Sequence, residues 1–219
     1  GGTLLRGRFF TQSELTGEQV IVLEEETADH LFGRLDPMGQ LVRVNGVPAR
    51  EGMDVKAGDV VTTGPASEVI FVTGKDAFLV RANSRVEAQG TAGALVLAGL
   101  RVVTGAVLSV FSPGERKRLS TPTATIGIRG TAVYLEAEDA RTYVCTCYGE
   151  TQISAADDPR VAERIVAKHH DAPRYVLKPG AGRRIQPAPF INHTDVELAL
   201  IEALVGRTTP FSLYDEDYG

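Results

Sequence analysis

Short stretches of alternating apolar and polar residues recur along the chain from residue 41 onwards, and turn-forming residues bound each of them. Because successive side chains of a strand point to opposite faces of a sheet, this period of two is typical of β-strands. The pattern predicts strands at residues 41–44, 58–64, 67–73, 77–81, 95–97, 101–104 and 106–111. Strands that recur every 8 to 12 residues or so, with turns between them, are typical of a β-sandwich, a barrel or a solenoid.

A longer hairpin is predicted within residues 120–150, where the alternation continues on both sides of a polar turn. Its two strands span residues 132–137 and 141–148. The second strand contains Cys145 and Cys147, the only cysteines of the chain. Residues two apart in a strand point to the same side, so we expect both thiols on one face of the sheet.

The last part of the chain is predicted to combine two further strands with one helix. Residues 164–169 and 174–177 favour strands that are joined by a turn. Residues 194–205 favour a helix, because Thr194 and Glu197 have the spacing of a capping box and apolar residues recur at helical spacing. We therefore expect an all-β domain followed by a C-terminal α-helix.

Three other segments carry weaker patterns. Residues 24–35 favour a short helix or an irregular arm, because a glycine and an Asp-Pro pair interrupt the helical pattern. The charge run at residues 115–118 is interpreted as a solvated hairpin tip rather than a binding patch. The acidic residues 214–218 are expected to form a mobile tail.

Composition and charge narrow the possible functions. The chain is 43% hydrophobic and 23% charged, as in an ordinary globular protein. Its net charge of −5 and the lack of a long basic run argue against a nucleic-acid partner. No apolar run approaches the ~20 residues of a membrane-spanning helix. No nucleophile elbow, phosphate-binding loop, dinucleotide fingerprint or metalloprotease motif is present, so we expect no enzymatic activity and no catalytic residues.

Two motifs resemble the FecR domain family. These are Gly-Asp-Val-Val-Thr-Thr-Gly at residues 58–64 and Thr-Pro-Thr-Ala-Thr-Ile-Gly-Ile-Arg-Gly-Thr at residues 121–131, and the resemblance covers roughly residues 43–155. It implies an extracytoplasmic, all-β module of bacteria, built as a sandwich or a twisted β-solenoid of short strands. Well-known members are sensors in iron-uptake signalling. Because the chain shows neither their anti-sigma segment nor their membrane helix, it resembles a stand-alone FecR-like protein, and only the fold and the periplasmic location are carried over.

The resemblance also implies a domain organisation. Residues 1–42 would form an N-terminal arm and residues 43–155 the FecR-like β domain. Residues 156–219 would form a C-terminal extension with a β-hairpin and the helix at 194–205. Within the β domain, Arg129 is expected to anchor neighbouring carbonyls or a carboxylate rather than a ligand.

Two thiols on one strand face are half of a site for a soft metal ion: copper, zinc or iron. Adjacent His169 and His170 are the candidates for the imidazole half, and at most one would reach the thiols from a strand. Asp171 could orient that imidazole, and His193 would either cap the helix or join the site. A Cys145–Cys147 disulfide would be strained in an extended strand, with Cα atoms roughly 6.5–7 Å apart, unless the backbone bulges.

These observations predict a non-enzymatic, periplasmic binding or sensing module. The predicted metal ligands are Cys145, Cys147, His169 and His170, and the expected partners are a metal ion or an envelope protein. Two alternatives remain open: a metal-free scaffold that binds a protein or a glycan, and a thiol redox module.

Overall fold

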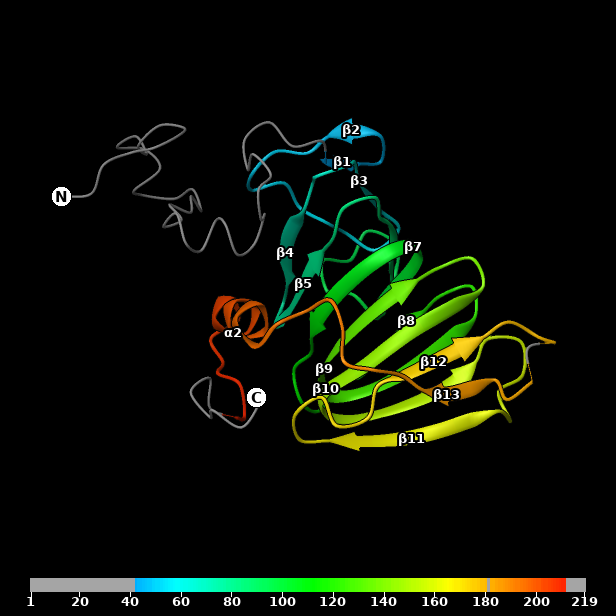
Figure 1. Ribbon diagram of the computed structural model, residues 1–219. Coiled ribbons are helices and arrows are strands. Elements are labelled where there is room, and N and C mark those ends of the chain that lie inside the picture. The colour runs from blue at the N-terminus through cyan, green and yellow to red at the C-terminus, as the bar shows by residue number, and fades with distance from the viewer. Residues whose placement is uncertain (1–41, 181, 212–219) are drawn as a thin grey trace.

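The computed structural model describes residues 42–180 and 182–211, which form strands and one helix (Figure 1). The strands are β1 (Val42–Val44), β2 (Val47–Pro48), β3 (Val60–Thr63), β4 (Val69–Thr73), β5 (Asp76–Val80), β6 (Arg85–Gln89), β7 (Gly99–Val110), β8 (Arg116–Ser120), β9 (Ala124–Ala137), β10 (Arg141–Ala155), β11 (Ala162–Ala167), β12 (Arg174–Leu177) and β13 (Ile185–Pro187). The helix is α2 (Asp195–Leu204). The predicted all-β class with a C-terminal helix is confirmed.

The strands join into one 13-stranded sheet, with the path β13-β12-β10-β9-β8-β7-β6-β3-β1-β2. Strand β11 pairs with β10, and β4 joins the sheet through β5. The predicted hairpin is confirmed as β9 and β10, which pair antiparallel along almost their whole length. Both strands extend beyond the predicted ends, so they form the long central ribbons in Figure 1.

Strand β7 changes partners halfway along, which lets one sheet enclose a core. Its first half pairs with β6 and β8, whereas its second half pairs with β5 and β9. Gly105 lies at the change with φ of +85°, and a Cβ there would lie 2.1 Å from Oγ of Ser84. Only glycine fits this position, so the predicted break between residues 104 and 106 is a bend within one strand.

The β9–β10 hairpin is buried on both faces. On one face, residues such as Leu135 and Val144 belong to the larger apolar core. On the other, Tyr134, Tyr143 and Cys145 belong to a smaller core, to which α2 contributes. Period-two alternation therefore divides the hairpin between two cores and places the cysteines in the one beside the helix.

Helix α2 begins and ends where the sequence predicts. The side chain of Thr194 accepts a hydrogen bond from the backbone of Glu197, and the Glu197 side chain bonds back to the Thr194 backbone, so the capping box is confirmed. Leu198 and Ile201 are fully buried in the smaller core. Val196 is one of the apolar residues that recur at helical spacing, but it is 53% exposed.

Two predicted segments differ from the structure. Residues 95–97 form no strand, because the loop between β6 and β7 buries only Leu97 and leaves Leu95 and Val96 exposed. The charge run at residues 115–118 is not a hairpin tip: from Arg116 onwards it lies in β8, between β7 and β9. Its parallel pairing with β7 is a long-range feature that no local turn signal predicts.

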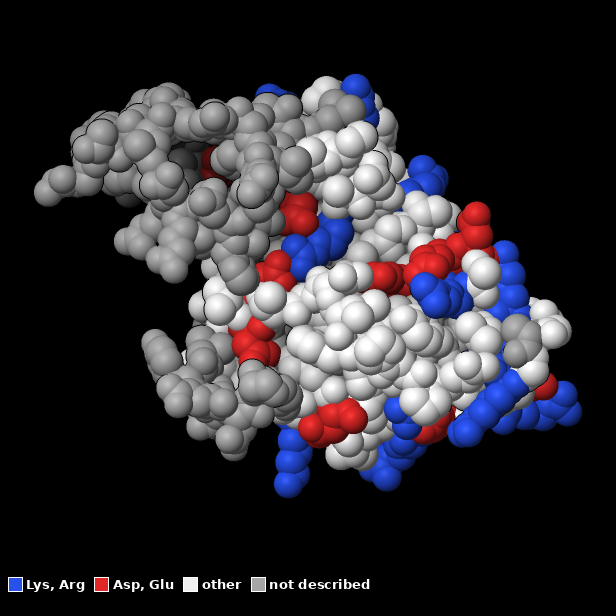
Figure 2. Space-filling view, in the orientation of Figure 1, with Lys and Arg blue, Asp and Glu red and all other residues white. Residues whose placement is uncertain are grey.

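The predictions for residues 24–35 and 214–218 concern segments outside the described residues. No helix in the described part of the chain is long and apolar enough to cross a membrane. On the face shown in Figure 2, Lys and Arg side chains gather along the right-hand and lower edges, around a broad area without charge.

Candidate metal centre

A bulge in β10 positions the two cysteines. Thr146 lies opposite Val133 and Tyr148 lies opposite Ala132, so Cys147 is an extra residue without a partner in the register. Such a bulge re-aims side chains, and bulges are frequent beside functional sites. Cys145 and Cys147 both lie in the smaller core, fully buried, and both thiols are free. The prediction that they share one face is confirmed, and they form no disulfide.

A tight turn after β11 brings the first imidazole to the thiols. Asp171 accepts a hydrogen bond from the backbone N–H of Lys168 at 2.7 Å, which closes the turn. His170 follows with φ of +54°, and its backbone N–H donates to the carbonyl of Cys147 at 2.9 Å. Asp171 therefore shapes the turn and does not orient an imidazole, contrary to the prediction.

The second imidazole comes from the segment between β13 and α2. The hydroxyl of Tyr143 donates to the carbonyl of Pro189 and accepts from the backbone N–H of Ile191, which fixes this segment on the sheet. His193 follows and is 4% exposed. Thr194 caps the helix, so His193 is free to join the thiols. The alternative that His193 caps the helix is wrong.

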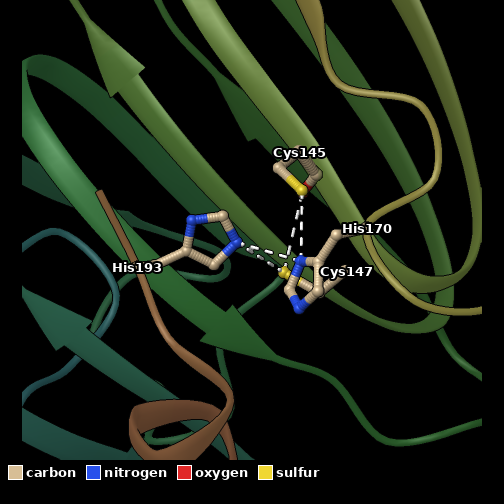
Figure 3. Close-up of side chains that lie close together, drawn as sticks. All are labelled: Cys145, Cys147, His170 and His193. Atoms are coloured by element: carbon tan, nitrogen blue, oxygen red, sulfur yellow. Dashed lines mark hydrogen bonds between the residues drawn. The ribbon is translucent and has the colours of Figure 1, made fainter. Parts of the chain in front are cut away.

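Cys145, Cys147, His170 and His193 thus meet in one place and are called the Cys–His cluster (Figure 3). Sγ of Cys145 lies 3.4 Å from Nδ1 of His170, and Sγ of Cys147 lies 3.5 Å from Nε2 of His193. The two ring nitrogens are 3.2 Å apart. All four potential ligand atoms lie within 4.8 Å of one another.

The outer nitrogen of each imidazole fixes which nitrogen faces the cluster. Nδ1 of His193 lies 2.8 Å from the carbonyl of Ile191, and Nε2 of His170 lies 2.9 Å from Oδ1 of Asp195. A carbonyl and a carboxylate accept only, so both outer nitrogens carry the proton. In the neutral rings the two inner nitrogens then present lone pairs to each other. Four electron-pair donors converge on one point, an arrangement that favours a cation.

His169 does not join the Cys–His cluster. Its Nε2 lies 2.7 Å from Oδ2 of Asp195, and its ring packs 4.0 Å from the ring of Phe211. His169, His170 and Asp195 form a second group of potential ligands, in which the same carboxylate contacts both rings. Of the four predicted ligands, Cys145, Cys147 and His170 lie in the cluster and His169 does not. The fourth member is His193, for which the sequence left open whether it caps the helix or joins the site.

Aromatic rings separate the cluster from solvent. The ring of Tyr134 stacks on His193 with 4.3 Å between centroids. The ring of Phe190 lies 4.5 Å from the ring of His170 and 4.7 Å from that of His193. The cluster is therefore enclosed in a medium of low dielectric constant, where interactions between its groups are strong.

The metal-free cluster favours a pair of opposite charges. Hydrogen bonds from Cys147 and then from the imidazoles outweigh burial and lower the pKa of Cys145 to about 4. Burial, followed by the neighbouring Cys145, raises the pKa of Cys147. Burial opposes a charge on His170, but its contacts with Cys145 and Asp195 outweigh burial and raise its pKa. When no metal is bound, Cys145 is thus a thiolate that accepts a hydrogen bond from Nδ1 of the protonated His170.

The Cys145 thiolate is expected to stabilise the metal-free protein increasingly as pH rises from about 4 towards about 8.5, where a free thiol ionises. The raised pKa of His170 has the opposite effect on the free energy of unfolding. The protonated imidazole contributes its full stabilisation below about pH 6.5 and loses it as pH rises through its raised pKa. The thiolate effect is therefore unopposed between about pH 4 and pH 6.5. Urea unfolding with a chelator present measures it as the difference between wild type and Cys145→Ser. That difference should grow across this window, and a constant difference would contradict the assignment.

Comparisons with known proteins add a family match in the N-terminal part. Residues 1–96 match the family described as MacB-like periplasmic core domain. The match ends before β7, so the Cys–His cluster lies outside it. No curated protein sequence matches the chain.

Two crystal structures described as an anti-sigma factor from Parabacteroides distasonis align with part of this chain. The first has 11% identity and a TM-score of 0.47, and the alignment covers 59% of this chain and 58% of that one. The second has 11% identity and a TM-score of 0.45, with coverages of 72% and 71%. This chain therefore spans less than two thirds of the first structure.

The resemblance to the FecR domain family is wrong, because the family that matches is the MacB-like periplasmic core domain. The two motifs that suggested it describe local backbone geometry. Gly58 has φ of +100° and Gly130 has φ of +52°, so one glycine in each motif meets a conformational requirement. Many β proteins share such requirements, and these motifs therefore do not identify a family.

Proposed function

We propose that this chain is a non-enzymatic, extracytoplasmic binding module that holds one zinc ion in the Cys–His cluster. The observation that carries the proposal is the spacing of the four ligand atoms. A tetrahedral zinc site with Zn–S near 2.3 Å and Zn–N near 2.0–2.1 Å has edges of about 3.5 Å between S and N and about 3.3 Å between N atoms. The corresponding distances in the cluster are 3.4 and 3.5 Å for S–N and 3.2 Å for N–N.

This spacing favours a single ion over an iron–sulfur cluster. A two-iron cluster held by two cysteines and two histidines places the thiolates and the imidazoles on different irons. Here each imidazole nitrogen lies beside a sulfur instead. Two thiolates and two imidazoles in a tetrahedral arrangement are the ligand set that zinc uses in structural sites.

The closed geometry supports a binding role and argues against catalysis. Catalytic zinc sites keep one position open for water or substrate, whereas this cluster offers four protein ligands that are all buried. The ligands come from β10, from the turn after β11 and from the segment before α2. A bound ion would therefore join the C-terminal helix to the sheet, so metal occupancy would control how firmly the helix is held.

Two further considerations support the extracytoplasmic location and the partners. The match of residues 1–96 to a periplasmic family agrees with export of the chain. In an oxidising compartment two neighbouring free thiols would be expected to pair or to bind a metal. The proposed partners are the metal ion itself and, as in the expectation from the sequence, an envelope protein.

Metal analysis of the purified protein tests the proposal. We expect close to one zinc per chain in the wild type and a large loss of zinc in Cys145→Ser, Cys147→Ser and His193→Gln. The matched control is His169→Gln, which removes a neighbouring histidine outside the cluster and should retain zinc. Zinc that survives both cysteine substitutions would refute the site. A metal-free wild type that cannot be loaded with zinc would favour the scaffold alternative.

A further inference from the structure

A hollow of about 630 Å³ lies on the sheet face away from the larger core, over strands β8, β9 and β10. Its lining includes Arg116, Arg118 and Arg129, all exposed. Along β8, Arg116 and Arg118 alternate with the buried Lys117 and Leu119, so the two arginines point to the same side. Its size falls within the usual range of ligand pockets, roughly 300–1,000 Å³.

The strand register concentrates positive charge there. Arg116 lies directly opposite Arg129 on the neighbouring strand. Like charges in this position destabilise a sheet, because their Cβ atoms are only about 5 Å apart. Arg118 lies opposite Gly127, whose missing side chain leaves room beside the guanidinium groups. Such a local conflict between sequence and fold is typical of a functional site.

Acidic side chains of the described residues offset the charge of these arginines only in part: Glu150 lines the hollow and attracts Arg129 electrostatically but forms no ion pair with it. Within residues 42–180 and 182–211, none of the three makes a hydrogen bond or an ion pair with an acidic side chain. Glu150 lies opposite Arg129, but both of its oxygens already accept from Arg164, at 2.7 and 2.6 Å. The hollow therefore carries excess positive charge in a chain whose net charge is −5.

We infer that this hollow binds a phosphate-bearing small ligand through Arg116, Arg118 and Arg129. Guanidinium groups bind phosphate oxygens through paired, charge-assisted hydrogen bonds, and a dianion between Arg116 and Arg129 would remove their repulsion. The phosphate belongs either to a soluble ester or to a lipid headgroup, which share this chemistry. The inference does not depend on the Cys–His cluster.

Thermal unfolding with added glycerol phosphate, at matched ionic strength in chloride, tests the inference. We expect a saturable increase in melting temperature for the wild type, since a ligand that binds only the folded state stabilises it. Arg116→Gln should lower the apparent affinity for the ester roughly tenfold or more. The double variant Arg116→Gln/Arg129→Gln should lower it by about that factor once more. The charge-matched control Arg85→Gln, on β6, should bind like the wild type.

A second variant separates the hollow from general charge effects. Gly127→Val keeps every arginine, and a Cβ at Gly127 makes only ordinary contacts, 3.8 Å from Cβ of Gln152. It should fold normally and bind the ester more weakly, because its side chain enters the hollow. A lack of stabilisation beyond that of chloride, or equal stabilisation of wild type and double variant, would overturn the inference.

Vesicle flotation distinguishes the two sources of phosphate. Binding of the wild type to phosphatidylglycerol vesicles, but not to phosphatidylcholine vesicles, with loss in the double variant, would assign the hollow to a lipid headgroup. Binding of the free ester without vesicle binding would assign it to a soluble phosphate ester. Both outcomes support the inferred chemistry.

Discussion

Zinc at a thousandfold excess over its dissociation constant is expected to stabilise this protein by about 4 kcal/mol, because it binds the folded state alone. For a chain of this size each kcal/mol corresponds to roughly 2–4 °C, so the melting temperature should rise by about 8–16 °C. The stabilisation arises because the ion fixes three segments that are distant in sequence. Differential scanning calorimetry with and without a chelator measures the increase.

Two variants separate the site from unspecific effects of zinc. Cys147→Ser should abolish the zinc-induced increase, whatever its own effect on the melting temperature. His169→Gln should preserve most of the increase, since the His169 ring contacts Asp195 and Phe211 instead of the thiols. An equal increase in wild type and Cys147→Ser would show that zinc binds elsewhere.

Arg81→Met is expected to destabilise the protein by about 3–5 kcal/mol, the cost of breaking a buried ion pair by removing one partner. The guanidinium of Arg81 lies 2.6 Å from Glu197 and 3.1 Å from Glu68. The Glu197 side chain is only 4% exposed, and Arg81 also donates to the carbonyl of Asn192 at 3.3 Å. The substitution would leave the charge of Glu197 buried without this cation. Urea unfolding measures the loss.

The same substitution should loosen the segment that carries His193, because Asn192 and the helix N-terminus lose one of their links to the sheet, while the bond from Asn192 to Glu136 remains. Hydrogen exchange in α2 should become faster, and zinc affinity should fall. The control is Arg141→Met, whose ion pair with Glu138 is exposed and contributes at most about 1 kcal/mol. Equal destabilisation by the two substitutions would show that the Arg81 pair has no special role.

Local patterns are sufficient to predict the elements that hold the candidate site. The alternation in residues 141–148 places both thiols on one face, because that property depends only on strand geometry. The helix start follows from the Thr194–Glu197 capping box, a contact between residues three apart. The pairing of β9 and β10 beside their turn also follows from two alternating stretches joined by a short turn, whereas the bulge at Cys147 does not.

The histidine pairing depends on long-range packing and could not be predicted in the same way. His169 and His170 are adjacent, and only the positive φ of His170 decides which ring turns towards the thiols. His193 reaches the cluster because Tyr143 holds the preceding segment on the sheet. One sequence feature points to His193: it directly precedes the N-cap residue Thr194, and the cap restrains the backbone at that point.

The charge run at residues 115–118 also shows that local patterns do not predict long-range strand pairing. Residues 115–118 follow a Ser-Pro-Gly turn, so a hairpin tip is the natural local interpretation. Strand β8 instead inserts between β7 and β9, and its pairing with β7 is parallel. No local pattern reveals this parallel pairing, whereas the alignment of Arg116 with Arg129 follows from the antiparallel pairing of the consecutive strands β8 and β9.

X-ray absorption at the zinc edge tests the central claim most directly, because it counts the atoms bound to the ion in the purified wild-type protein. The account predicts two sulfur ligands at about 2.3 Å and two nitrogen ligands at about 2.0–2.1 Å. A shell of oxygen and nitrogen atoms without sulfur would contradict it, since the ion would then lie outside the cluster formed by Cys145, Cys147, His170 and His193.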